Sequence, residues 1–427
     1  MVRGRAAMVR GRAAMVRGRA AVREGFAVVV RSYVAVFGGC AAMVRGYAQR
    51  FYRAPGWPRR SPFRDARPSP AAGNANPARP DRACRYRLAH RIVRCMDVLP
   101  ARALLLAPMV ELSHRPLREL VASFGGCDRY YTEMTSASGY LANSPWDRWF
   151  MDCEPDPART VVQLYDSDIE PLAAATARFL AERNAAGQPV GGFDLNFGCS
   201  APHIEKAGGG VSWMKDGDRA ATLVRAVRAA APGVSLSAKL RLGYEESGDA
   251  LVEYCAGLAD AGVDYLVLHP RLKHEKFRRT GRWAYVRMVA ESIGIPVVGN
   301  GDIRTFAQYK TAIADYAAAG VMIGREAVRR PWFFALIRGT EADAGFEMTI
   351  DIEETGLRMF ELIRAHLPTP YHASRIRRFF HYYCDNLAFG HHLRYAIRNA
   401  PDIDTMERLF RAYFDEVPAE RVKVQRG

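Results

Sequence analysis

The first 95 residues of this chain contain no lysine, although they hold 21 arginines and only three acidic residues. The net charge of +16 therefore divides into +18 (21 − 3) for this segment and −2 (40 − 42) for residues 96–427. The basic excess thus belongs to one end of the chain. Residues 96–427 need a local basic face if they are to bind a polyanion.

This first segment is also of low complexity. It opens with the heptad Met1–Ala7, which repeats at Met8 and Met15, and it later becomes rich in proline and arginine over 53–82. An Arg-rich nucleic-acid arm and a targeting peptide are two interpretations, but arginine without lysine favours upstream sequence translated from a start codon assigned too early. We expect no packed fold over 1–95, which is either disordered or a mis-assigned start, and we expect Met96 to be the natural start.

The chain also lacks paired cysteines and long apolar runs. Its eight cysteines show neither metal-ligand spacing nor a dense disulfide framework. No stretch reaches the roughly 18 uninterrupted apolar residues of a membrane-spanning helix. We therefore expect a cytoplasmic protein in a reducing compartment, with no metal site and no membrane partner.

From residue 103 onward, apolar runs alternate with helical stretches, which is typical of βα units around a parallel sheet. The predicted strands are Ala103–Met109, Arg129–Met134, Thr160–Tyr165, Gly192–Phe197, Ser235–Leu242, Tyr265–His269, Pro296–Asn300 and Gly320–Ile323. The predicted helices are Arg115–Phe124, Pro171–Ala186, Asp218–Ala231, Leu251–Ala261, Trp283–Ile293 and Phe306–Ala314. Eight units indicate an α/β fold, a (β/α)8 TIM barrel over 96–340 with a small C-terminal helical domain over 341–427. An open doubly wound sheet is the alternative, but it would not need eight units.

Polar side chains follow several of these strands. Asn196 and Cys199 stand at the end of the fourth strand, where parallel barrels carry their reactive groups, although a lone cysteine is more often a small buried residue. Gln163, Lys239 and His269 interrupt other apolar runs, and a ligand would satisfy such groups, as would hydrogen bonds within the interior. The segments Asn300–Asp302 and Gly324–Arg325 follow the last two strands, where many barrels bind a phosphate.

Together these residues resemble the tRNA-dihydrouridine synthase family over about 103–415. The motifs, in the family's order, are Ala107-Pro108-Met109, Thr132-Glu133-Met134, Gln163, Asn196-Phe197-Gly198-Cys199, Gly208-Gly209-Gly210, Lys239-Leu240-Arg241-Leu242-Gly243, His269, Asn300-Gly301-Asp302 and Gly324-Arg325. The resemblance implies an FMN-binding barrel that reduces a uridine in the D-loop of tRNA, with NADPH as the reductant. The pattern Asn399-Ala400-Pro401-Asp402-Ile403 is most similar to the branch that acts on position 16.

The resemblance also implies a role for each matching residue. Pro108 and Met109 would lie against the flavin, Gln163, Lys239 and His269 would hydrogen-bond it, and Asn300, Gly301, Asp302, Gly324 and Arg325 would complete the cofactor site around its phosphate. Asn196, Glu133 and Arg271 would contact the substrate, and Cys199 would be the acid. The chemistry agrees, because hydride transfer to C6 of uracil requires a proton at C5, and a thiol with a pKa near ~8.5 is mostly protonated at neutral pH.

The chain departs from the family pattern at three places. Ser200 and Ala201 separate the cysteine from the proline that usually follows it, and Pro270 replaces a familiar glycine after His269. In the first motif the familiar glycine and aspartate are Glu111 and His114. These departures suggest a divergent branch, in which His203 and His274 are available as substitute acids, although each is more simply a loop histidine.

The C-terminal domain interleaves arginines with aromatics over 371–383. Its aromatics fit the core of an amphipathic helix. Five of its arginines are predicted to contact tRNA phosphates: Arg375, Arg377, Arg378, Arg394 and Arg398. We expect a monomer that flips the target base into the barrel mouth. Two alternatives remain open, an FMN-dependent barrel dehydrogenase of a small molecule (dihydroorotate type) and a catalytically silent tRNA-binding protein.

Overall fold

The structure is a computed structural model that describes residues 98–276 and 278–427, all within one compact unit, Arg79–Gly427. The predictions for residues 1–95, and for Met96 as the start, lie outside the described residues. No helix in the described part of the chain is both long and apolar enough to cross a membrane.

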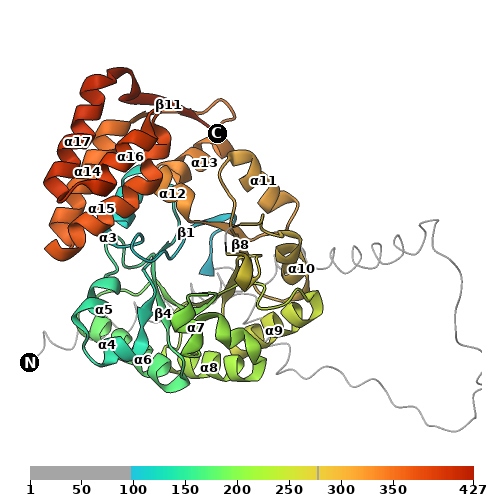
Figure 1. The fold of residues 1–427 in the computed structure, drawn as a ribbon. Helices are drawn as coiled ribbons and strands as arrows, with labels where there is room; N and C mark the ends of the chain where they lie inside the picture. The colour runs from blue at the N-terminus through green and yellow to red at the C-terminus, as the bar shows by residue number, and fades with distance from the viewer. Residues whose placement is uncertain (1–97, 277) are drawn as a thin grey trace, which may run out of the picture. The chain divides into compact units, whose positions relative to one another are not determined.

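A parallel β-barrel forms the first part of this unit, as predicted (Figure 1). Its strands are β1 (Ala103–Leu106), β2 (Tyr130–Tyr131), β3 (Thr135–Ser136), β4 (Thr160–Tyr165), β5 (Gly192–Phe197), β6 (Leu236–Leu240), β7 (Tyr265–Leu268), β8 (Val297–Asn300) and β9 (Gly320–Ile323). The hydrogen-bonded order runs β1-β9-β8-β7-β6-β5-β4-β2, and a parallel bridge from Leu105 to Arg129 joins β1 to β2. All eight predicted strands are present. The two-residue strand β3, which pairs with β4, was not predicted, because two residues carry no periodicity.

Helices surround the barrel on its outer side (Figure 1). They are α3 (Arg115–Phe124), α4 (Ala137–Leu141), α5 (Pro145–Phe150), α6 (Ile169–Ala185), α7 (Pro202–Lys206), α8 (Gly217–Ala230), α9 (Gly248–Ala261), α10 (Ala284–Ser292), α11 (Phe306–Ala314), α12 (Arg325–Arg329) and α13 (Phe333–Ala342). Helix α9 ends at Gly262, whose φ of 118° is accessible to glycine and strained for other residues. The six predicted helices are all found, each within three residues of its expected start.

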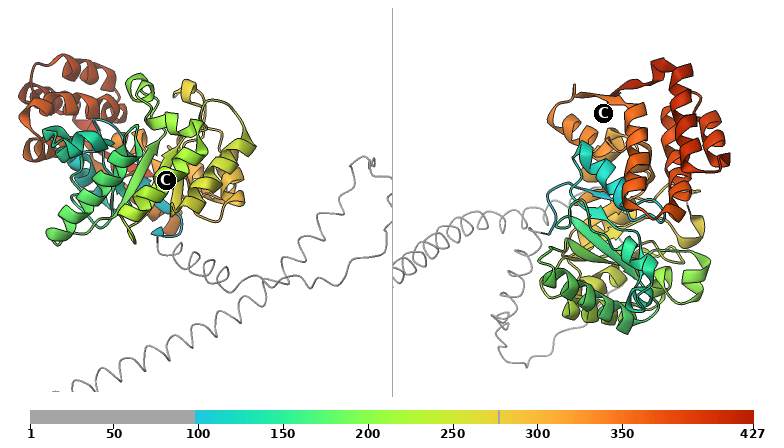
Figure 2. Two further views of the ribbon diagram at one scale, coloured as in Figure 1. Left: turned by 90° about the horizontal axis from the view of Figure 1, so that it is seen from below. Right: turned by 90° about the vertical axis from the view of Figure 1, so that its left-hand side faces the viewer.

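The C-terminal region packs against the barrel as a helical bundle, which Figure 2 shows in red from two further directions. Its helices are α14 (Ile352–His366), α15 (Thr369–Tyr383), α16 (Gly390–Asn399) and α17 (Ile403–Glu416). An antiparallel pair, β10 (Glu347–Asp351) with β11 (Val422–Arg426), joins its two ends, so the expectation of helices alone was incomplete. Helix α14 packs on α3 and α15 on α12, which brings α15 beside the barrel mouth.

Candidate active site

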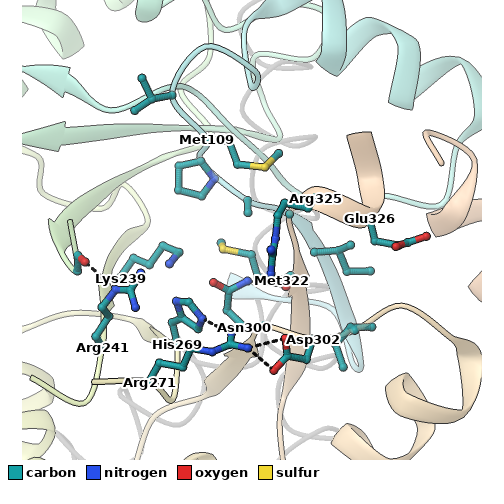
Figure 3. A pocket seen from close by; sticks show the side chains of 18 of the residues that line it. Met109, Lys239, Arg241, His269, Arg271, Asn300, Asp302, Met322, Arg325 and Glu326 are labelled. Carbon is teal, nitrogen blue, oxygen red and sulfur yellow. Dashed lines mark hydrogen bonds and ion pairs between the residues drawn. The ribbon is translucent and has the colours of Figure 1, made fainter. Parts of the chain in front are cut away.

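A cavity of about 400 Å³ opens at the carboxyl ends of the barrel strands. Every barrel residue that the sequence predicted for the site, except Glu133, lines this cavity: Pro108, Met109, Gln163, Asn196, Cys199, Lys239, His269, Arg271, Asn300, Gly301, Asp302, Gly324 and Arg325. Figure 3 shows Lys239, His269 and Arg325 pointing from different elements into the same space. The fold therefore collects residues that are up to about 200 positions apart in the chain, as expected of the C-terminal face of a TIM barrel.

Strand register places the polar side chains at one level. In the β4–β5 pair Gln163 lies opposite Asp194, and in the β5–β6 pair Asn196 lies opposite Lys239. Because side chains alternate between the two faces of a strand, Asp194 and Asn196 share the inner face of β5. The barrel interior at this level is therefore polar, while Phe193, Leu195 and Phe197 pack in the hydrophobic core.

A chain of hydrogen bonds runs through these side chains to the cysteine. Ser237 Oγ and Gln163 Nε2 donate to the two oxygens of the fully buried Asp194, at 2.5 and 2.7 Å. Asn196 Nδ2 donates to Gln163 Oε1 at 3.0 Å, and Asn196 Oδ1 accepts the Cys199 N–H at 2.8 Å. Because the Asp194 carboxylate can only accept hydrogen bonds, the amide nitrogen of Gln163 must face it. The Gln163 oxygen then faces the amide nitrogen of Asn196. Burial raises the pKa of Asp194 to about 6, and the hydrogen bonds from Gln163 and Ser237 oppose that rise.

The Cys199 segment is held by its backbone as well. The Val211 N–H donates to the Cys199 carbonyl at 2.9 Å. Gly210 has a φ of +56°, and a Cβ there would lie 2.4 Å from the same carbonyl oxygen, so only glycine fits. Burial raises the pKa of the half-buried Cys199 thiol, and Arg241 and Lys239 weaken this rise without reversing it. The thiol is consequently protonated at neutral pH and suited to give up a proton.

Cys199 lines the cavity although the sequence next to it departs from the family pattern. Pro202 is the first residue of α7, a position where its missing N–H is no loss. Ser200 and Ala201 therefore lengthen the turn before the helix. His203 and His274, the substitute acids considered above, are both exposed and neither lines the cavity.

Two cations, Lys239 and Arg325, line the cavity. Burial and the neighbouring Arg241 lower the pKa of Lys239 to about 8, and its ammonium has no hydrogen-bond or ion-pair partner among the residues that the structure describes. Burial also lowers the pKa of Arg325. His269 is neutral at pH 7, because burial and the charges around it lower its pKa well below the usual value. An anionic ligand would compensate these charges.

Arg271, by contrast, is fully engaged. It donates to both oxygens of Asp302 at 2.7 Å and contacts His269 Nε2 at 2.9 Å (Figure 3). Burial would raise the pKa of Asp302, but hydrogen bonds from Arg271 and the Gly281 N–H hold it below its ordinary value. Gly301 has a φ of +115°, and a Cβ there would lie 3.0 Å from the His269 ring. This corner of the cavity is preorganised, and both the positive φ and the tight contact with His269 favour glycine at position 301.

Glu133 lies outside the cavity and is buried. Its Oε2 accepts the Glu111 N–H at 2.5 Å, while Oε1 is buried without a hydrogen-bond partner in the described residues. Burial raises the pKa of Glu133 to about 7, although Arg375 acts in the opposite direction. Glu133 thus supports the loop after β1 and does not face the cavity.

Glu111 is the residue in place of the family's familiar glycine, and its φ of 67° explains why glycine suits this position. Its carboxylate lies 3.3 Å from Arg375 and 3.8 Å from Arg378. Arg375 is only 6% exposed, while Arg378 is exposed. Glu111 therefore ties the barrel loop to α15 and neutralises part of the basic face expected there.

The other three predicted arginines lie on α15 and α16. Arg377 donates to the Ala400 carbonyl at 2.7 Å, and Arg394 pairs with Asp385. Arg398 is exposed. The structure therefore gathers Arg377, Arg394 and Arg398 on one side of the bundle, apart from the Arg375–Glu111 pair.

The sequence reasoning gave no role to Asp194 and Ser237, nor to Arg241, which it quoted only within a motif. Arg241 lines the cavity, and its Nε donates to the Gly198 carbonyl at 3.0 Å. Strand alternation offered a signal, because Asp194 stands two residues before Asn196 and Arg241 two after Lys239. None of the His, Cys, Asp and Glu side chains in the described residues form a group of three or more that could hold a metal ion.

Comparison with known proteins assigns the family. The model of the dihydrouridine synthase family (Dus) matches residues 105–415, which span the barrel and most of the helical bundle. This chain belongs to the dihydrouridine synthase family. It is accordingly an oxidoreductase, and the resemblance noted in the sequence is confirmed.

Several relatives carry a more specific name. The tRNA-dihydrouridine(16) synthase of Cupriavidus necator is 32% identical over 246 residues, which cover 55% of this chain and 73% of the relative. That of Neisseria meningitidis serogroup A is 27% identical over 327 residues, covering 74% of this chain and 95% of the relative. A probable tRNA-dihydrouridine synthase of Rhodobacter capsulatus is 32% identical over 234 residues, covering 55% and 70%.

Proposed function

We propose that this dihydrouridine synthase reduces the C5–C6 double bond of uridine 16 in the D-loop of tRNA, with FMN as cofactor and NADPH as reductant. The observation that carries the proposal is one cavity that combines a protonated thiol, Cys199, with two cations, Lys239 and Arg325, of which Lys239 is buried with no ion-pair partner in the described residues. A neutral base alone would not need those cations, whereas a phosphate-bearing cofactor would. The (16) names of the relatives support the choice of uridine.

The residues present fit FMN. Half-buried Pro108 and Met109 offer an apolar wall, and Lys239 offers a positive charge in the same cavity. At the other end Gly301 and Arg325 stand where a phosphate would be held, and a side chain at Gly301 would press on the His269 ring. The cavity volume of about 400 Å³ lies in the range of ligand pockets.

In this proposal Cys199 supplies the proton. When bound, FMN would supply the hydride that reaches C6 of the uracil. Protonation at C5 by the Cys199 thiol completes the reduction, because one hydride and one proton together saturate the double bond. Lys239 and Arg241, which oppose the rise in the pKa of Cys199, stabilise the thiolate that remains. Solvent then restores the thiol proton.

Asn196 and Gln163 position the reacting groups. Asn196 Oδ1 is used by the Gly198 and Cys199 N–H groups at 3.2 and 2.8 Å, so this side chain fixes the segment that carries the acid. Its remaining N–H points to Met134 Sδ at 3.3 Å, a weak acceptor that a uracil carbonyl would replace. Asp194 holds both amides in this orientation through Gln163.

The helical bundle would bind the tRNA backbone. Arg378, Arg394 and Arg398 are accessible enough to reach phosphates, while Arg375 would contribute mainly through its pair with Glu111. Flipping the uridine into the cavity requires binding energy spread over the RNA, and these arginines are placed to supply it. We further propose that the enzyme acts as a monomer in the cytoplasm.

The test is a reaction of the full-length protein with unmodified tRNA. A yellow protein that forms dihydrouridine only with NADPH, and only at position 16, would support the whole proposal. Bound flavin that is oxidised by a small molecule such as orotate but not by tRNA would favour the dehydrogenase alternative. A colourless protein that binds tRNA would indicate a catalytically silent relative.

A further inference from the structure

We propose that a second cavity, between α15 and α16, binds the nucleotide next to the flipped uridine, with its base against Tyr395 and its phosphate beside Arg377, Arg394 and Arg398. This inference rests on the proposed function, because it assumes that an RNA strand enters the barrel mouth. It concerns a separate site, and it gives the bundle a role in selecting the sequence context of the target.

The second cavity is basic and partly aromatic. Its volume is about 250 Å³. Its lining residues are Arg377, Phe380, His381, His391, Arg394, Tyr395, Ile397 and Arg398, and none of these eight is acidic. A concave site with three arginines and flat rings fits a phosphorylated nucleoside better than an extended flat phosphate contact.

The arginines are fixed in place with unused donors. Arg377 is anchored through the Ala400 carbonyl and Arg394 through Asp385. The Nε of each is nevertheless buried without a hydrogen-bond partner in the part of the chain that the structure describes. A buried donor without an acceptor is costly, and a phosphate entering beside these two side chains would supply acceptors.

The electrostatic environment of His381 supports an anion at this place. Burial lowers the pKa of His381, and the charges of Arg394, Arg378 and Arg398 lower it further, with Asp385 as the opposing charge. His381 is therefore neutral at pH 7, and the positive field around it comes from fixed guanidinium groups. The three guanidinium groups keep their charge across the physiological pH range.

Tyr395 provides a surface for a base. It is 72% exposed, an unusual state for a large aromatic side chain without a ligand. When a uridine is flipped out of its strand, its neighbours lose their stacking partner. An exposed aromatic ring beside the mouth can replace that partner, because every base has a π-face.

Residues that touch one another line the two cavities. Tyr382 and Asp385 line the barrel cavity, while His381 and Arg394 line the second. The His381 and Tyr382 rings lie 4.8 Å apart, and Arg394 pairs directly with Asp385. This neighbourhood supports the proposal that a strand with one nucleotide in the barrel places an adjacent nucleotide in the second cavity.

The chemistry of the site is that of a phosphorylated nucleoside, which could come from the tRNA or from the dinucleotide reductant. Steady-state kinetics of the full-length enzyme on tRNA and on NADPH distinguish these sources. The variants are Tyr395→Ala and Arg398→Glu, with Arg408→Glu on α17 as the control, since Arg408 is also exposed but lies outside the cavity. Two further tRNAs carry an abasic site on the 5′ or the 3′ side of the target uridine.

We expect Tyr395→Ala to raise the KM for tRNA about tenfold, within the range of base–aromatic stacking, with little change in kcat and none in the KM for NADPH. One of the two abasic tRNAs should lower wild-type kcat/KM by a similar factor and lower that of Tyr395→Ala no further. Arg398→Glu should weaken tRNA binding at least as much, and more at low salt.

The proposal fails if Tyr395→Ala and Arg398→Glu both behave like Arg408→Glu. It also fails if each abasic tRNA lowers kcat/KM by the same factor in the wild type and in Tyr395→Ala. A rise in the KM for NADPH with an unchanged KM for tRNA would instead assign the cavity to the reductant and overturn the proposal. Direct tRNA binding separates this proposal from the proposed function. If the wild type forms no dihydrouridine but Tyr395→Ala still weakens binding, the reaction is wrong and the cavity assignment is supported.

Discussion

The barrel mouth and the helical bundle hold their polar groups in different ways. In the mouth, Asp194, Gln163 and Asn196 are buried and bonded to one another in a fixed sequence. In the bundle, Arg378 and Arg398 are exposed. Geometry therefore governs the mouth, and charge governs the bundle. We expect substitutions in the mouth to change kcat and to be insensitive to salt, and substitutions in the bundle to change tRNA affinity in a salt-dependent way.

The largest effect is expected for the acid. Cys199→Ala should lower kcat for dihydrouridine formation about 10²- to 10⁴-fold, the range for loss of a general acid, with tRNA binding and the flavin spectrum retained. Because burial raises the pKa of Cys199, wild-type kcat should stay constant through neutral pH and fall only as alkaline pH removes the thiol proton.

Cys255→Ala is the matched control, because Cys255 is a buried cysteine of α9 that does not line the cavity. It should leave kcat unchanged. Activity in Cys199→Ala close to that of the wild type would remove the cysteine from the mechanism and return attention to other proton donors.

The next largest effect is expected for Asp194→Asn. An asparagine cannot accept from both Ser237 and Gln163 as the carboxylate does, so the amide of Gln163, and then that of Asn196, must turn or lose its partner. Each unmet buried group costs about 1–3 kcal/mol, so we expect kcat/KM to fall about 10- to 100-fold.

Measuring this loss at different salt concentrations tests whether Asp194 acts through geometry or through charge. The loss in Asp194→Asn should be the same at low and high ionic strength, because no charge on the RNA side is altered. Ser237→Ala, which removes one donor and leaves the carboxylate, should cause a smaller loss. If Asp194→Asn instead changed only the KM for tRNA, the idea that this carboxylate orients the catalytic amides would be wrong.

Cofactor binding should depend on the charge of Lys239. Its pKa is lowered to about 8, so the ammonium is present below pH 8 and is lost above it. FMN affinity, measured by fluorescence titration, should therefore fall as pH rises from 7 to 9, by about tenfold for the loss of one favourable charge contact of about 1.4 kcal/mol. Lys239→Met should bind FMN weakly at pH 7 and show a flat profile, whereas Lys239→Arg should bind FMN without this decline.

The smallest effect is expected at the contact between the two regions. Glu111→Gln removes the negative charge beside Arg375 and Arg378, so tRNA should bind about two- to fivefold more tightly at low salt, as expected for a partly exposed pair. Arg378→Ala should weaken tRNA binding. It should also lower the slope of log affinity against log salt concentration by about one unit or less. Tighter binding that persists at high salt would contradict an electrostatic origin.

Much of the barrel was predictable because its signals are local. Apolar runs such as Ala103–Leu106 predict buried strands, and β-strand ends predict where side chains such as Cys199 and His269 must gather. The roles of Glu133 and Arg375 were not predictable. Their charged side chains suggested contacts with a ligand, but both residues are buried and contact Glu111 within the protein. These contacts depend on how α15 packs beside the loop after β1.

The sequence by itself determined the fold class, the order of the strands and many of the cavity residues, because periodicity and strand ends can be recognised from neighbouring positions. Only the tertiary structure decided which polar groups bond to one another and which remain free. The chain of hydrogen bonds that starts at Asp194 depends on the register between β4, β5 and β6. The second cavity depends on how α16 lies against α15. Such contacts join residues distant in the chain, and packing alone fixes their distances.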